Sequence, residues 1–120
     1  MKEEFAELAE AVKKTLALCP WIKQQTLESY KDELLSEAEE MAKAVDNEDY
    51  TNLKEEVGDL LWDIVMFAHL AEKKGHFRVE EAVKGIVEKM KRRKPYIFEG
   101  REVSMEEAVR IWDEAKNEEH

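Results

Sequence analysis

The sequence contains few of the residues that mark secreted, fibrous or membrane proteins. Of its 120 residues, one is cysteine, two are proline and four are glycine. The single cysteine, Cys19, excludes an intrachain disulfide, so a reducing cytoplasmic setting is the simplest expectation. The chain has no apolar run of about 18 residues that could cross a bilayer. Its amino end, MKEEFAELAEAV, is acidic and amphipathic, which does not fit a signal peptide. We therefore expect no membrane partner.

Positive charge is also scarce. The chain has 19 Lys and Arg residues against 29 Asp and Glu residues, a net charge of −10. This balance argues against a nucleic-acid partner, whose binding depends on neutralising phosphates. A small phosphorylated ligand stays possible, because a metal ion or a local basic cluster can hold it. With 43% hydrophobic and 40% charged residues, the composition predicts one helical domain over residues 1–120 with a highly charged surface.

Apolar residues recur at helical spacing through most of the chain, which predicts an all-α, four-helix-bundle-like fold with a short C-terminal helix. The segment CPWIKQQT is expected to be an ordered connector, and YIFEGREVS to be extended or looped with a turn at Gly100. Ser104 and Glu107 match the capping-box spacing at the start of the last helix. The expected helices cover residues 3–18, 26–45, about 50–74, about 80–94 and about 105–116.

The helix expected over residues 50–74 has two apolar sides. We expect the larger stripe to be buried and the smaller, which includes Trp62 and Met66, to lie away from it. A helix that is apolar on more than one side is central in a bundle or packs on another subunit, which favours a homodimer formed through the central helices. The stripes expected to be buried are Leu34, Leu35, Ala38, Met41, Ala42 and Val45; Leu53, Val57, Leu60, Ile64, Ala68 and Ala71; and Val83, Ile86, Val87 and Met90.

Two acidic pairs lie on the two central helices. Glu37 and Glu40 are three residues apart, as are Glu56 and Asp59, so each pair occupies adjacent turns of one helix face. If the helices pack antiparallel, these carboxylates can converge, and their repulsion would require a cation such as Mg²⁺ or Mn²⁺. Gly58 costs on the order of 1 kcal/mol inside a helix, which suggests a close backbone approach. The alternative is that each pair is an ordinary solvated helix face.

A dense basic cluster precedes Pro95. Cations suit the last turn of a helix, yet in a chain of net charge −10 this cluster is where an anion would be drawn. It comprises Lys89, Lys91, Arg92, Arg93 and Lys94.

Earlier in the chain, Trp21 is expected either to fill the end of the core or to stack on a flat ligand ring, and the core is the favoured interpretation.

Five segments together resemble the MazG-type nucleoside triphosphate pyrophosphohydrolases, in order and at similar spacing. The resemblance extends from about Cys19 to Lys116. It implies an all-α domain, usually dimeric or built into larger assemblies, that uses Mg²⁺ to cleave a nucleoside triphosphate to the monophosphate and pyrophosphate in a housecleaning role. The segments are CPWIKQQT, LLSEAEEMAKAV, LKEEVGDLLWDIVMFAHLAEKKGHF, EKMKRRKPYIFEG and SMEEAVRIWDEAK.

The resemblance also implies roles for individual residues. The metal-binding carboxylates of the family correspond to Glu37, Glu40, Glu56 and Asp59. Glu37 and Glu40 are the better candidates for the general base, and Lys89 and Arg93 complete the expected catalytic set as counter-charges to the phosphates. The residues expected to bind substrate are Lys31, Arg92, Arg93, Trp112, Lys116 and Trp21.

The chain departs from the family pattern at several positions. The first Glu of the EExxE signature is Ser36 here, and the other departures are Ile22, Leu27, Lys94 and Tyr96. The four principal ligand positions are intact, but the preferred base and sugar cannot be transferred from the family. The pattern also leaves open whether the substrate is a standard or a damaged nucleotide and whether two chains share one site.

Two other functions fit parts of the sequence. The first is a non-catalytic acidic bundle that acts as a protein-interaction or regulatory module, with Trp62 and Met66 in its interface. The second is a di-iron carboxylate bundle, which normally needs Glu-x-x-His pairs on facing helices. The sequence contains no such pair, and His69, His76 and His120 are not placed to supply one.

Overall fold

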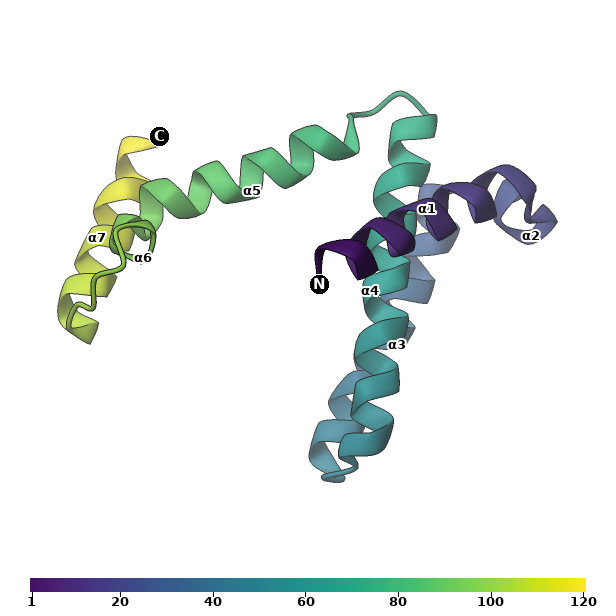
Figure 1. The fold of residues 1–120 in the computed structure, drawn as a ribbon, viewed down its shortest axis with the longest axis horizontal. Helices are drawn as coiled ribbons and strands as arrows, with labels where there is room; N and C mark the ends of the chain where they lie inside the picture. Colours follow the sequence, from purple (N-terminus) through teal and green to yellow (C-terminus); the bar gives the residue numbers. More distant parts are fainter. The chain divides into compact units, whose positions relative to one another are not determined.

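The computed structural model describes residues 1–120 and is helical without any strand (Figure 1). It divides into two compact units, Met1–Val79 and Glu80–His120, and each is described by itself below. None of its helices is long and apolar enough to span a bilayer. The helices are α1 (Lys2–Leu18), α2 (Pro20–Lys23), α3 (Leu27–Asp46), α4 (Tyr50–Lys73), α5 (Val79–Arg93), α6 (Pro95–Phe98) and α7 (Met105–Glu118).

Side-chain caps begin the three helices whose amino ends the sequence marks most clearly. Thr26 and Ser29 form a reciprocal capping box at α3. Asp49 accepts a hydrogen bond from a backbone N–H in the first turn of α4, and Ser104 does the same at α7. Such caps satisfy N–H groups that have no partner inside the helix. The predictions of the five main helices are confirmed to within a few residues.

Two short helical turns lie where the sequence predicted non-helical chain. α2 occupies the expected connector, and α6 lies in the segment expected to be extended or looped. Each begins with a proline, whose fixed φ suits the first position of a helix. The predicted turn at Gly100 is confirmed, because this residue has a φ of 67°.

The core of the first unit lies where α1, α2, the start of α3 and the second half of α4 meet. Its fully buried members come from all four helices, and Leu8, Leu16, Leu27, Trp62, Val65 and Phe67 pack around them. The buried core residues are Val12, Ile22, Tyr30, Met66 and Leu70.

The most buried side of α4 is opposite to the stripe that the sequence predicted, although Ala71 of that stripe is 1% exposed and Leu53, Leu60 and Ala68 are half-buried. Met66 and Leu70 are 0% and 3% exposed, whereas Val57 and Ile64 are 48% and 52% exposed. At 3.6 residues per turn these two pairs lie on opposite sides of the helix. The prediction was wrong because periodicity identifies two apolar sides but does not tell which of them packs within the chain.

A smaller error of the same kind concerns α3. Its inner face carries Tyr30 and Ala44, which are buried, and the half-buried Leu34, Ala38 and Met41. Three members of the predicted stripe, Leu35, Ala42 and Val45, are exposed. The face that packs on α4 is therefore rotated from the prediction, and Glu37 lies within this face instead of along its edge.

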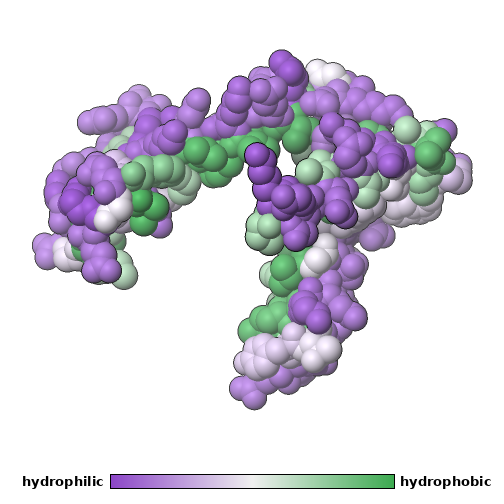
Figure 2. Space-filling view, in the orientation of Figure 1, coloured by the Kyte–Doolittle hydropathy of each residue, from purple (hydrophilic) through white to green (hydrophobic).

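In the second unit, Arg93 and Tyr96 are the buried residues. Three residues of α5 that were expected to be buried, Val83, Ile86 and Val87, are 57%, 51% and 42% exposed. Figure 2 shows hydrophobic surface along α5 and, separately, along the α3–α4 hairpin. Both units thus carry apolar side chains that their own folding does not cover.

Candidate metal centre

The α3–α4 hairpin brings together three of the four predicted metal ligands. One carboxylate oxygen each from Glu37, Glu56 and Asp59 lies within 4.8 Å of the others. The helices run antiparallel after a short connection (Figure 1), as predicted. Glu37 and Glu56 are partly buried and Asp59 is exposed, so the group lies at the edge of the helix interface and is open to solvent on one side.

The fourth predicted ligand, Glu40, lies outside this group. Its side chain is 48% exposed and forms an ion pair of 3.5 Å with Lys43, one turn further along α3. An exposed pair at this spacing contributes a few tenths of a kcal/mol at most, so it would hold Glu40 only weakly.

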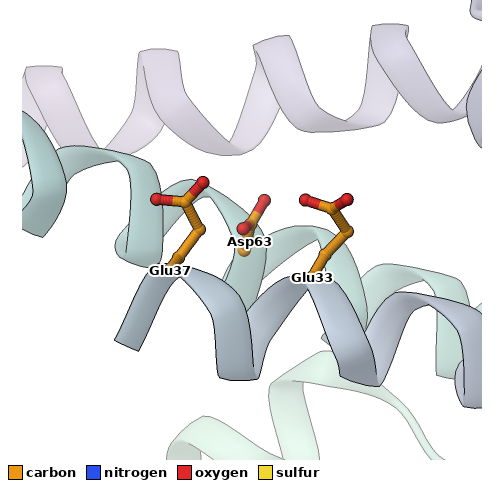
Figure 3. A group of neighbouring side chains, drawn as sticks. All are labelled: Glu33, Glu37 and Asp63. Atoms are coloured by element: carbon orange, nitrogen blue, oxygen red, sulfur yellow. The ribbon is translucent and has the colours of Figure 1, made fainter. Parts of the chain in front are cut away.

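A second group of carboxylates shares Glu37 with the first. Oxygens of Glu33, Glu37 and Asp63 also lie within 4.8 Å of one another, the two glutamates on α3 and the aspartate on α4 (Figure 3). Asp63 is only 9% exposed, and the hydroxyl of Tyr30 donates a hydrogen bond of 2.8 Å to its Oδ1. Glu33, Tyr30 and Asp63 were not predicted from the sequence, although an acid inside the apolar run LLWDIVMF was a usable signal.

The crowding of carboxylates disfavours their ionisation. Burial, a hydrogen bond with Glu56 and the charge of Asp59 raise the pKa of Glu37 to about 7. Burial also raises the pKa of Asp63, and the hydrogen bond from Tyr30 opposes that rise. For Tyr30 itself, burial and then the bond to Asp63 raise the pKa of the phenol. The local field is therefore strongly negative.

This donor set fits a hard divalent cation. Oε2 of Glu56 is buried and has no hydrogen-bond partner, which leaves an acceptor that a metal ion could satisfy. Two lysines of α3 are engaged elsewhere, Lys31 with Glu28 at 3.0 Å and Lys43 with Glu40. Carboxylate oxygens with solvent on one side suit Mg²⁺ or Mn²⁺, which retain water ligands.

The basic residues predicted to bind phosphate lie in the second unit. Arg92 and Arg93 both pair with Glu119, and the Arg93 guanidinium lies over the ring of Trp112, 4.8 Å from its centroid. Lys89 is partly buried and Lys116 is exposed. Beside them is a groove of about 210 Å³, lined by Lys94, Tyr96, Met105, Ala108, Val109 and Trp112.

Trp21 is half exposed, which differs from the core position favoured by the sequence. Its side chain is 51% exposed, and its ring lies 6.2 Å from that of Tyr30 at an angle of 58°. Ile22, the next residue, takes the core position instead. Trp21 therefore lies beside Tyr30 at the edge of the core and leaves about half of its surface exposed.

No other part of the chain packs closely against Gly58, contrary to the expectation of a close backbone approach there. A Cβ placed on this residue meets no atom within 4 Å. The packing of α3 on α4 thus gives no reason for a glycine at this position.

Comparison with known proteins identifies relatives for most of the chain. Residues 25–98 match the family model described as the MazG nucleotide pyrophosphohydrolase domain. A crystal structure of a MazG-related protein from Thermotoga maritima superposes with a TM-score of 0.89 at 38% identity, over 93% of this chain and 98% of that one.

Curated relatives are longer than this chain. An uncharacterised protein of Bacillus subtilis, YabN, is 38% identical over 102 residues, which cover 84% of this chain and 21% of the relative. A nucleoside triphosphate pyrophosphohydrolase of Escherichia coli is 33% identical over 102 residues, again 84% of this chain but 39% of the relative. The chain thus spans between about a fifth and two fifths of these relatives.

Proposed function

Since the chain belongs to the family of MazG nucleotide pyrophosphohydrolase domains, we propose that it hydrolyses nucleoside triphosphates to the monophosphate and pyrophosphate with the help of Mg²⁺. The observation that carries the proposal is the convergence of Glu37, Glu56 and Asp59 on the α3–α4 hairpin. The wider role we propose is the removal of unwanted nucleotides from the cytoplasm, where the lone thiol of Cys19 would stay reduced.

In this proposal, Glu37, Glu56 and Asp59 hold the cation, and Glu40 adds a carboxylate from the next turn of α3. Mg²⁺ bound there would offset charge on the triphosphate and acidify a water molecule. Mn²⁺ would be a possible substitute, because it accepts the same oxygen ligands.

The remaining roles fall to other side chains. Glu37 or Glu40 accepts the proton of the attacking water. Lys89, Arg92, Arg93 and Lys116 offset phosphate charge, as the resemblance to the family implies.

Aromatic side chains are the proposed contacts of the nucleoside. Trp112 lines a groove of about 210 Å³ together with Tyr96 and Met105, and an indole edge or face there could pack on a base. Trp21 is 51% exposed, and Lys31 lies on the exposed side of the first turns of α3. Trp112, Trp21 and Lys31 complete the proposed substrate-binding set.

We also propose a homodimer. The support is the apolar side of α3 and α4 that the single chain leaves exposed, with Leu35 at 58%, Val45 at 51%, Val57 at 48%, Leu61 at 38% and Ile64 at 52%. Exposed apolar groups on neighbouring helices are typical of an association surface. In this proposal, residues 1–120 act as one pyrophosphohydrolase domain.

The test is a reaction of the purified chain with Mg²⁺ and a panel of standard and damaged triphosphates, followed by separate assays of pyrophosphate and orthophosphate. We expect pyrophosphate from at least one substrate. Glu56→Gln should abolish its release, whereas Glu55→Gln should not, because Glu55 is exposed and belongs to neither carboxylate group. Orthophosphate as the sole product, or equal activity of the two variants, would refute the proposal.

A further inference from the structure

Glu119, one residue beyond α7, bridges two consecutive arginines at the end of α5. Its Oε2 accepts from Nε of Arg92 at 3.1 Å and its Oε1 accepts from an Nη2 of Arg93 at 2.8 Å. The side chains of Glu119 and Arg93 are only 21% and 11% exposed. The Arg93–Glu119 contact is therefore shielded from solvent, whereas Arg92 is 53% exposed. The two contacts join residues 26 and 27 positions apart in sequence, unlike the pairs within single helices.

The Arg93 side chain is fixed on a second side by Trp112. The guanidinium carbon lies 4.8 Å from the centroid of the indole ring, a contact in which the ring face attracts the cation. The same guanidinium has a buried Nε without a hydrogen-bond partner. This nitrogen is enclosed by the protein, so the phosphate-facing donors of Arg93 are those of its terminal Nη groups.

We propose that Glu119 is a positioning residue, which holds the Arg92 and Arg93 guanidiniums ready for the phosphates of the substrate. This proposal rests on the proposed function, because it assigns phosphate binding to both arginines. Each guanidinium has five N–H donors, and the bridge uses one donor from each. The bridge leaves the other donors of Arg92 and the remaining Nη donors of Arg93, and the side chains that carry them no longer need to be ordered when substrate binds.

The bridge between Glu119 and the two arginines does not depend on pH in the range where the protein would work. Hydrogen bonds from Arg93 and Arg92 lower the pKa of Glu119 to about 2, so its carboxylate stays charged at any working pH. A carboxylate that merely occupied the phosphate position would compete with substrate, and its removal would tighten binding. A positioning carboxylate predicts the opposite, because without it both arginines regain rotamer freedom that binding must then remove.

The experiment uses the full chain and compares Glu119→Gln with Glu118→Gln, which removes the same charge from the neighbouring residue. Titration calorimetry with inorganic triphosphate measures phosphate binding without hydrolysis, and steady-state assays with Mg²⁺ and the preferred nucleotide separate KM from kcat. For E119Q we expect weaker triphosphate binding and a higher KM, each on the order of tenfold, with kcat changed less. E118Q should match the wild type, and Glu119→Asp should recover part of the loss because it keeps a carboxylate one methylene shorter.

Each result bears on the proposal. Equal binding by E119Q and the wild type would overturn it, and tighter binding by E119Q would identify Glu119 as a competitor of phosphate. If E119Q lost its helical circular dichroism, Glu119→Ala would carry the test, and wild-type triphosphate binding by that variant would overturn the proposal. A wild-type chain that binds triphosphate in a Glu119-dependent way but releases no pyrophosphate would refute the proposed reaction and leave the positioning role standing.

Discussion

Tyr30 donates its hydroxyl to Asp63 across the α3–α4 interface, at 2.8 Å, and both side chains are buried. The contact joins the core of the first unit to its carboxylate groups, because Tyr30 belongs to the core cluster and an oxygen of Asp63 lies within 4.8 Å of oxygens of Glu33 and Glu37. Core packing thus fixes the position of one of the acids beside the candidate metal centre.

We expect Tyr30→Phe to lower the free energy of unfolding by about 1–3 kcal/mol, because it removes a buried donor and leaves the Asp63 carboxyl without that partner. Urea unfolding followed by circular dichroism measures the change. Tyr50→Phe is the matched control, since Tyr50 is 65% exposed and its loss should change little. Equal effects of the two substitutions would show that the Tyr30 hydroxyl contributes nothing to stability.

The raised pKa of Glu37 predicts a pH-dependent effect of metal ions. The pKa is about 7 in the fold against an ordinary value of 4.5. Between these pH values the folded chain binds more protons than the unfolded chain, so without metal its stability falls as pH rises. Divalent cations bind the ionised form, so Mg²⁺ should raise the melting temperature more at pH 8 than at pH 5.5.

Differential scanning fluorimetry with and without Mg²⁺ at the two pH values measures this effect. Glu37→Gln should flatten the pH dependence of the metal-free chain and greatly reduce the Mg²⁺ effect at pH 8. An identical Mg²⁺ shift at both pH values, or an undiminished shift in E37Q, would contradict the assignment of Glu37 as a ligand.

Gly58→Ala should stabilise the fold by about 0.5–1 kcal/mol, because alanine has the higher helix propensity and the added methyl group meets no atom within 4 Å. The control is Gly75→Ala, which should destabilise, since Gly75 has a φ of 84° that alanine adopts poorly. Chemical denaturation measures both. A loss of stability in G58A would show that a group outside the single chain approaches this glycine.

Ile64→Lys should convert the proposed homodimer to monomer, because it would bury a charge in the apolar surface of α4. Sedimentation velocity over a range of concentrations measures the association state. Leu18→Lys is the control, because Leu18 is 75% exposed at the end of α1, away from that surface. A wild-type chain that is monomeric at every concentration would refute the dimer directly.

The sequence was sufficient for the bounds of the five main helices and insufficient for the side on which α4 packs. The polar cap Ser104 is a local signal and was confirmed. Val57 and Met66 are both apolar at helical spacing, and the choice between their sides depends on α1 and α3, which local patterns do not encode.

The candidate site was predictable in part for a similar reason. Glu37, Glu56 and Asp59 follow from acid spacing and from the family resemblance, and they do converge. Asp63 was missed because it lies four residues after Asp59 on α4, outside the three-residue spacing of the two predicted pairs. Its contact with Tyr30 joins residues that are 33 positions apart in sequence. Glu40 matches the spacing rule but lies outside both groups, since small rotations of a helix decide which carboxylates meet.

Glu37 contributes to both carboxylate groups of the hairpin, and this double membership limits how the protein can be re-engineered. A replacement of Glu37 alters both carboxylate groups together. The metal preference of the group with Glu56 and Asp59 therefore cannot be changed through Glu37 alone without also altering the group with Glu33 and Asp63. A substitution that changes one carboxylate group alone must therefore be made at a residue that belongs to only one group: Glu33, Asp63, Glu56 or Asp59.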